Sequence, residues 1–275
     1  MTLMLFAIVL SLTGAVTGVI AGLLGVGGGI VVVPALYLIL PVFSIDESLR
    51  MHLAVGTSLA TIVPTALVSA RAHHRHGAVD RVLLRIWGPG VFAGAVLGAA
   101  LAGPVRGDVL TLVFATVALI VAVNMGFGRQ NPRPPDVPAK TPAKARFSAV
   151  IAMLVGFIST WMGIGGGTLA VPIFTLFRVP IHRAVGTAAV LGLVIGVPGA
   201  IGFAISGWGQ PGLPPASLGY VNLIAFGLIV PTSALCSPLG ARLAHAISAP
   251  KLRTAFAIFL AVTSARMFYG VFIGS

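Results

Sequence analysis

Charge is scarce in this sequence, and negative charge is almost absent. Only 8% of its 275 residues are charged, with 5 Asp or Glu against 17 Lys or Arg, whereas about 25% of a soluble domain is charged. Hydrophobic residues make up 57% of the chain, and its mean hydropathy is +1.07. A folded chain of this composition has too few polar residues to cover its surface in water. The sequence therefore predicts an all-α protein that crosses a lipid bilayer several times.

The rare cysteine and carboxylates exclude several functions. The single Cys236 lies in an apolar run, which excludes a disulfide framework and a cysteine-based metal site. Cation transporters usually need a carboxylate inside the membrane, and its absence favours an anionic substrate. The runs also lack a nucleophile with a base and a set of metal ligands, so we expect no enzyme activity, no cofactor and no bound metal. All five acidic residues fall in links or at run ends: Asp46, Glu47, Asp80, Asp108 and Asp136.

The net charge of +12 does not indicate nucleic-acid binding. The cations lie in short links between apolar runs rather than on one face of a folded domain. Membrane proteins concentrate Lys and Arg in their cytoplasmic links in this way. We therefore expect the partners to be the lipid bilayer and a small anion, with no nucleic acid.

Apolar runs divide the chain into candidate spans of roughly 20 residues. Most have the length of one span, but the first and the fifth are too long, and each contains a cluster of glycines. Lipid cannot satisfy free backbone groups, so such a break must be buried in protein or line a cavity. The runs cover residues 2–40, 50–70, 82–102, 109–127, 147–177, 184–206, 217–240 and 252–273.

The basic links determine the expected orientation. Three of them, at residues 71–85, 129–146 and 242–253, should be cytoplasmic by the positive-inside rule. All three agree only if the fifth run enters the membrane and returns to the same side. The same hairpin in the first run predicts periplasmic N- and C-termini in a bacterial inner membrane, with the central linker in the cytoplasm.

Two re-entrant hairpins, each followed by three transmembrane helices, give two halves of opposite orientation. We expect a first repeat at residues 1–128, a cytoplasmic linker rich in proline and basic residues at 129–146, and a second repeat at 147–275. Inverted repeats are the layout of many secondary transporters.

The glycine cluster of residues 25–34 returns at residues 163–172 with a constant offset of 138. The apolar piece after each cluster is about half a membrane thick at roughly 1.5 Å per residue. Its N-terminus would lie near the midplane, where free N–H groups and the helix dipole favour an anion. The alternative is that the glycines only allow close helix packing. Two matched clusters favour a substrate site, made by Gly27, Gly28, Gly29, Gly165, Gly166 and Gly167.

A second block repeats with an offset of 130, at residues 52–58 and 182–188. Its hydroxyl groups belong to Thr57, Ser58 and Thr187. They either donate to the oxygens of an anion or bond back to their own helices. We include them in the expected substrate site.

Four further polar residues are candidates for gating or steering the substrate. His52 and His182 begin the second block, and they either anchor helix ends or form a titratable gate. Arg266 lies well inside the last run, where it either steers an anion or extends to the membrane surface. Asn124 is its counterpart in the first half, because each precedes a glycine by the same spacing.

These patterns resemble the TauE/SafE family of sulfite exporters. The resemblance rests on Gly22-Leu-Leu-Gly-Val-Gly-Gly-Gly29 with Pro34, on the second glycine cluster and on the two Ala-Val-Gly-Thr blocks, and it spans nearly the whole chain. It implies an inner-membrane permease for sulfite or organosulfonates such as sulfoacetate. The second copy has Ala188 where the first has Ser58, so the two half-sites need not be equivalent.

The residues and the resemblance together predict a secondary transporter, in the direction of export. Its substrate would be a small sulfur-containing anion bound between the two glycine-broken hairpins. One alternative is an anion channel for the same substrates. Another is a membrane assembly subunit that does not itself transport.

Overall fold

The architecture is all-helical, as predicted. The computed structural model describes residues 2–24, 28–127, 145–246 and 249–273, and in them the chain forms ten α-helices and one short antiparallel ribbon. The first half consists of α1 (Thr2–Leu24), α2 (Gly29–Ile39), a 3-10 turn (Leu40–Phe43), α3 (Glu47–Arg75), α4 (Arg81–Ala102) and α5 (Gly107–Phe127).

The second half repeats this order of helices. It consists of α6 (Ala145–Met162), α7 (Gly166–Leu176), α8 (Ile181–Ser206), the ribbon strands β1 (Ser217–Leu218) and β2 (Val221–Asn222), α9 (Leu223–Ala246) and α10 (Ala249–Phe272). Both over-long apolar runs are therefore broken at their glycines into a longer and a shorter helix.

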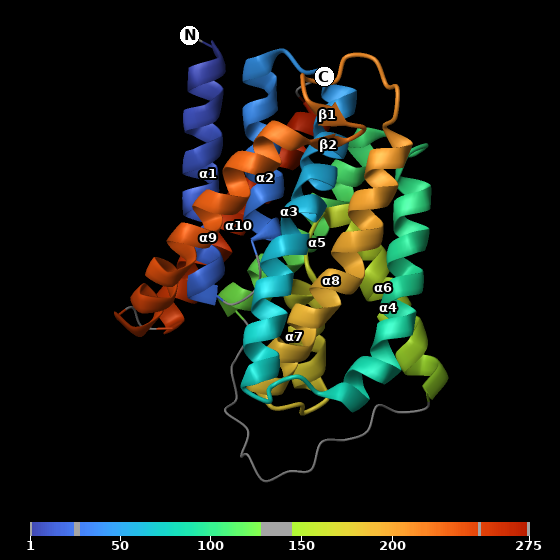
Figure 1. Ribbon diagram of the computed structural model, residues 1–275, viewed down its shortest axis with the longest axis vertical. Helices are drawn as coiled ribbons and strands as arrows, with labels where there is room; N and C mark the ends of the chain where they lie inside the picture. The colour runs from blue at the N-terminus through green and yellow to red at the C-terminus, as the bar shows by residue number, and fades with distance from the viewer. Residues whose placement is uncertain (1, 25–27, 128–144, 247–248, 274–275) are drawn as a thin grey trace.

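Each broken run turns back on itself (Figure 1). Helix α1 descends from the upper end of the molecule and α2 returns toward that end, whereas α6 rises from the lower end and α7 returns to it. The N- and C-terminal ends of the chain both lie at the upper end. The two hairpins thus enter the helical assembly from opposite ends.

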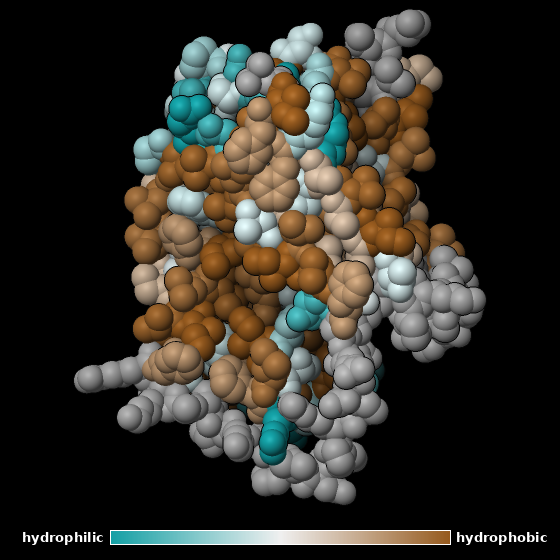
Figure 2. Space-filling model, turned by 180° about the vertical axis from the view of Figure 1, so that it is seen from behind, coloured by the Kyte–Doolittle hydropathy of each residue, from teal (hydrophilic) through white to brown (hydrophobic). Residues whose placement is uncertain are grey.

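Five of the described helices are long and apolar enough to cross a membrane: α3, α4, α5, α8 and the Thr254–Phe272 part of α10. The sixth expected span, α9, has a described apolar part of only Leu223–Leu239. Figure 2 shows a broad apolar surface over most of the height of the molecule, with hydrophilic residues gathered near the upper end. Such a surface suits lipid rather than water, so the chain is a multi-pass membrane protein.

The most extensive helix contacts each join a helix of the first half to a helix of the second half. Helix α1 packs along α9 and α6 packs along α4, while α3 contacts α8 and α5 contacts α10. Glycines make the first two approaches possible. A Cβ added to Gly18 would collide with the carbonyl oxygen of Ser233, and one added to Gly156 would collide with that of Val91. Small residues commonly allow this close contact between membrane helices.

Two of the rare acidic residues begin helices. Asp46 caps α3 by accepting the N–H of Ser48 at 2.9 Å, and Asp80 caps α4 by accepting the N–H groups of Val82 and Leu83, each at 3.0 Å. A carboxylate at this position satisfies free N–H groups and the positive end of the helix. The Ser48 hydroxyl also donates to Asp46, and together these bonds hold the pKa of Asp46 below its ordinary value.

Candidate functional site

The two glycine clusters meet in the interior of the molecule. A Cβ added to Gly29 would lie 2.6 Å from the carbonyl oxygen of Gly163, so the backbones are in direct contact. The hydroxyl of Ser58 donates to that carbonyl at 2.7 Å and lies 3.5 Å from the carbonyl oxygen of Gly29. The fully buried Ser58 therefore joins α3 to both hairpins.

Each short helix of a hairpin begins at a glycine of its cluster. Gly28 is the N-cap of α2 and Gly165 is the N-cap of α7, so no side chain caps either helix. The amides of Val31 and Val32 both donate to the carbonyl of Gly28 at 3.0 Å. Amides in the first turn of a helix have no acceptor within that helix, and their positive polarisation attracts anions. Gly27, the remaining residue of the expected site, lies outside the described residues.

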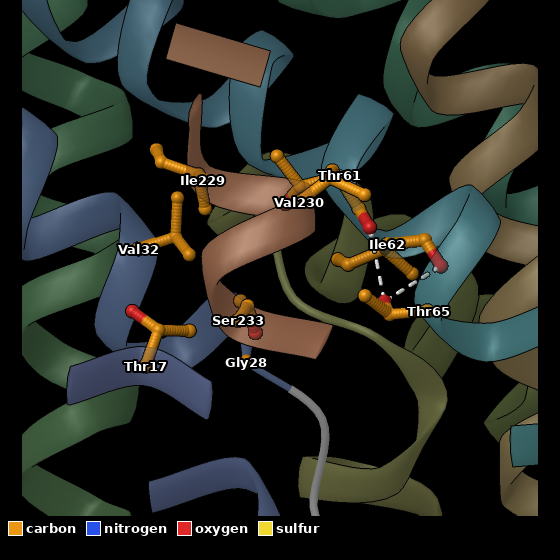
Figure 3. Close-up of a pocket in the computed structure, with 10 residues that line it drawn as sticks. Thr17, Gly28, Val32, Thr61, Ile62, Thr65, Ile229, Val230 and Ser233 are labelled. Atoms are coloured by element: carbon orange, nitrogen blue, oxygen red, sulfur yellow. Dashed lines mark hydrogen bonds between the residues drawn. The ribbon is translucent and has the colours of Figure 1, made fainter. Parts of the chain in front are cut away.

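A small cavity lies beside the start of α2 (Figure 3). Its volume is about 10 Å³, close to the minimum that one water molecule needs. In the close-up, α1 and α2 lie on one side, α3 lies on the other, and α9 crosses between them. The residues that line it are Thr17, Gly28, Gly29, Val32, Thr61, Ile62, Thr65, Ile229, Val230 and Ser233. None of these ten side chains is ionisable.

Four residues that carry hydroxyl groups line this cavity, and the sequence analysis did not select them. Thr61 donates to the carbonyl of Ser58 at 2.7 Å, and Thr65 donates to that of Thr61 at 2.9 Å. Thr17 and Ser233 complete the set from α1 and α9. A signal was present in the sequence, because positions 58, 61 and 65 follow one face of a helix. The second block has no hydroxyl at the corresponding positions.

Thr17 is distinguished by its missing partner. Among the described residues, its Oγ1 is one of the buried side-chain atoms with no hydrogen bond, together with Trp87 Nε1 and the hydroxyls of Ser148, Ser159 and Thr168. Of this group only Thr17 lines the cavity. A buried hydroxyl without a partner is costly, so its position beside the cavity calls for an explanation.

The hydroxyls of Thr57 and Thr187 have a different geometry from that of Ser58. Thr57 Oγ1 accepts the N–H of Asn222 at 2.9 Å, and Thr187 Oγ1 accepts the N–H of Asp80 at 3.0 Å. Asn222 accepts the N–H of Ala225 at 2.8 Å with its side chain, so both partners lie at the start of a helix. Each threonine thus fastens the link before α9 or α4, and neither lines the cavity.

The glycine before each threonine serves the same contact. A Cβ on Gly56 would collide with the carbonyl oxygen of Tyr220, and one on Gly186 would crowd that of Ala78. In each repeated Gly-Thr pair, the glycine therefore lets a link approach the helix closely. The threonine hydroxyl then accepts a hydrogen bond from a backbone N–H of that link.

We expect Thr57→Val and Thr187→Val each to lower the free energy of unfolding by about 1–3 kcal/mol, because each leaves a backbone N–H without its acceptor. Unfolding in SDS and thermal melting in detergent would measure the change. The matched control is Thr160→Val, since Thr160 is equally buried and its hydroxyl donates to the carbonyl of Gly156 in its own helix. Equal losses in all three variants would contradict the assignment.

The two histidines lie in different surroundings. His52 is 3% exposed, and its ring nitrogens lie 3.2 Å from the carbonyl oxygen of Ser48 and 3.1 Å from that of Ala102. His182 is exposed at the start of α8. His52 thus connects α3 to the end of α4, and neither histidine reaches the cavity.

Arg266 and Asn124 also lie away from the cavity. Both are exposed, on α10 and α5. The guanidinium of Arg266 lies 5.8 Å from the centre of the Tyr269 ring, which is a cation–π distance. Of the expected site residues, the structure brings together Gly28, Gly29 and Ser58, and the second cluster reaches them through Gly163 and Ile164. Thr57, Thr187 and the four gating candidates lie elsewhere.

Comparisons with known proteins identify the family of this chain. A family model described as "Sulfite exporter TauE/SafE" matches residues 10–267. The chain belongs to the TauE/SafE family. A probable membrane transporter protein of Haemophilus influenzae is 36% identical over 264 residues, which is 96% of this chain and 98% of that protein.

More distant relatives carry similar names. The probable membrane transporter protein YunE of Bacillus subtilis is 27% identical and covers 73% of this chain and 79% of its own length. The probable membrane transporter protein MJ0441 of Methanocaldococcus jannaschii is 24% identical, with 92% of each chain covered. No solved structure matches the chain. As a TauE/SafE member with these relatives and this apolar surface, the protein is a membrane transporter.

Proposed function

We propose that this TauE/SafE transporter is an inner-membrane secondary carrier that exports small sulfur-containing anions such as sulfite or organosulfonates. The observation that carries the proposal is the cavity at the start of α2, where hydroxyls and helix amides meet without any ionisable side chain. Such a site offers hydrogen-bond donors and a positive helix end to an oxyanion. It offers no carboxylate to a cation. The printed description of the family supports sulfite as the first substrate to test.

The proposed mechanism uses two inverted halves, residues 1–128 and 147–275, joined by the linker. Matching contacts with fixed offsets support it. Gly18 meets Ser233 as Gly156 meets Val91, with offsets of 138 for the glycines and 142 for their partners. The opposite entry of the two hairpins in Figure 1 agrees with inversion. Rocking of the halves about the central site would give alternating access.

The proposed orientation follows from charge. The basic link between α3 and α4 lies at the end of the molecule opposite the two termini, and α6, which follows the central linker, begins at that same end (Figure 1). By the positive-inside rule that end is cytoplasmic, and the termini are periplasmic.

The test is a thermal-shift screen of the purified chain against sulfite, sulfate, sulfoacetate, taurine and chloride. An anion that binds the folded protein adds about 2.7 kcal/mol of stability when its concentration is 100 times its dissociation constant. The melting temperature rises as a result. We expect a shift with a sulfur oxyanion that is lost in the Gly28→Leu, Gly166→Leu double variant. An equal shift in the double variant would show that the substrate does not bind at the hairpins.

Transport by reconstituted protein separates the remaining alternatives. A carrier shows saturable flux and counterflow of the labelled anion, whereas a channel shows neither. Absence of any flux from correctly folded protein would instead indicate an assembly subunit.

A further inference from the structure

We infer that the anion binds at one place only, the hydroxyl-lined cavity of the first half. The corresponding region of the second half is a packed structural copy without a site. This inference rests on the proposed function and narrows it, because it replaces two equivalent half-sites by a single asymmetric one.

The offsets between the halves identify the residues that correspond to the cavity lining. They are 138 for the hairpins, 130 for α3 and α8, and 142 for α4 and α9, and the last is also the spacing of Pro89 and Pro231. The four lining hydroxyls of Thr17, Thr61, Thr65 and Ser233 correspond to Val155, Leu191, Ile195 and Val91, in that order. Each of these four aliphatic residues is at most 4% exposed. The polar lining around the first hairpin is therefore replaced by apolar core around the second.

The packing at the start of α7 is also closer than the packing at the start of α2. A Cβ on Gly166 would lie 2.8 Å from the carbonyl oxygen of Ala188 and 2.9 Å from Leu191 Cβ, so α7 begins in close contact with α8. The corresponding Gly28 has no neighbour on α3 within that range, since its Cβ would meet only the Thr17 side chain. Gly28, the N-cap of α2, is therefore not crowded by α3 as Gly166 is by α8, and the cavity lies beside it.

Ile62 separates this cavity from the second hairpin. It lines the cavity, and its methyl groups would lie 3.0 Å from a Cβ on Gly29 and 3.6 Å from one on Gly165. The side chain thus stands between the two glycine clusters. An anion at α2 would reach the amides of α7 only if Ile62 moved.

The hydrogen bonds already present in the cavity lining indicate which hydroxyl group would donate to the anion. Thr61 and Thr65 already donate to backbone carbonyls, so they can only accept. Thr17 is 1% exposed, and its hydroxyl has no partner among the described residues. The Thr17 methyl group faces Gly28, so this hydroxyl would donate to an oxyanion beside the first amides of α2 after rotation about its χ1 bond. The site has room for an anion only after a small expansion, which suits a closed state of a carrier.

The experiment measures binding of sulfite to the full-length chain in detergent by titration calorimetry. The variants are Thr17→Val, which removes the hydroxyl at nearly constant volume, and Thr17→Ser, which keeps it. Thr168→Val is the matched control, because it removes another buried and unpartnered threonine hydroxyl, on α7 of the second half. Ser233→Ala provides a second, independent change in the cavity.

We expect one sulfite per chain in the wild type. Thr17→Val should bind about tenfold more weakly or worse, since a hydrogen bond to a charged group is lost. Thr17→Ser should remain close to the wild type, Ser233→Ala should weaken binding, and Thr168→Val should leave it unchanged. Melting curves without sulfite verify that each variant is folded. If Thr17→Val does not fold, the affinity of Ser233→Ala for sulfite tests the site instead.

Two results would overturn the single site. One is binding of two sulfites per chain; the other is a loss in Thr168→Val that equals or exceeds the loss in the cavity variants. Failure of the proposed function has a different signature, because the wild type itself would then show no binding of sulfite, sulfate or sulfoacetate.

Discussion

Gly163→Ala is expected to lower the free energy of unfolding by about 2–5 kcal/mol, from backbone strain together with crowding. Gly163 has a φ of +63°, which favours glycine. An added Cβ would lie 2.8 Å from Val33 Cγ2 and 2.9 Å from Val55 Cα. Its carbonyl also accepts the hydroxyl of Ser58, so a shift of this residue disturbs the junction of the two hairpins. Transport should fall with stability, because the same junction positions α2.

Two other glycines separate strain from crowding. Gly77 has a φ of +65° but no atom within 4 Å of its Cβ position, so Gly77→Ala measures strain alone. Gly227 lies in α9 with nothing within 4 Å and no strained φ, so Gly227→Ala should be neutral or slightly stabilising. Melting temperature and the yield of monodisperse protein in detergent give the comparison. A Gly163→Ala variant as stable as Gly227→Ala would show that the hairpin junction is not tightly packed.

Trp87→Ala is expected to cost about 3–5 kcal/mol, the usual range for removing a large aromatic side chain from a core. Trp87 is 0% exposed, and its ring centre lies 4.8 Å from that of Phe174 in an edge-to-face arrangement. It joins α4 to α7, beside the second hairpin. By the offset of 142 it corresponds to Ile229, which lines the cavity beside the first hairpin. The melting temperature should drop by about 10 °C.

The control for this variant is Trp208→Ala, because Trp208 is 71% exposed and its loss should change little. Sulfite affinity, measured below the melting temperature, should stay within about twofold of the wild type if Trp87 only supports the second half. A Trp87→Ala variant that melts like Trp208→Ala would contradict its role in the core. A large loss of affinity would place Trp87 near the substrate.

The broad fold followed from the sequence because its causes are local. Glycines 25–29 and 163–167 interrupt apolar runs that are too long for one span, and the chain breaks there into a longer and a shorter helix. Composition alone required a membrane, since 57% of the residues are hydrophobic. The sequence was less informative about the start of α9, because the expected run begins at residue 217, whereas the helix begins at Leu223 after the ribbon.

The site was predicted only in part. The glycines and Ser58 could be selected because they repeat or stand in a repeated block. The hydroxyls of Thr17 and Ser233 could not, because each is an isolated polar residue in an apolar helix. Thr17 comes beside α2 because the hairpin folds α2 back on α1, and Ser233 joins it because α9 packs along α1. Thr57 and Thr187 illustrate the converse, since a hydroxyl inside a motif suggested ligand binding, whereas its partner is a distant backbone amide.

The sequence by itself determined the membrane environment, the helical class, the glycine breaks and the resemblance to TauE/SafE. Each of these depends on composition or on spacing along the chain, which sequence shows directly. Only the tertiary structure decided that α1 packs on α9 and α6 on α4, that Ser58 bonds to Gly163, and that a hydroxyl-lined cavity lies beside α2. These features depend on contacts between residues far apart in the chain, and such contacts are set by side-chain shape and close backbone approach rather than by local pattern.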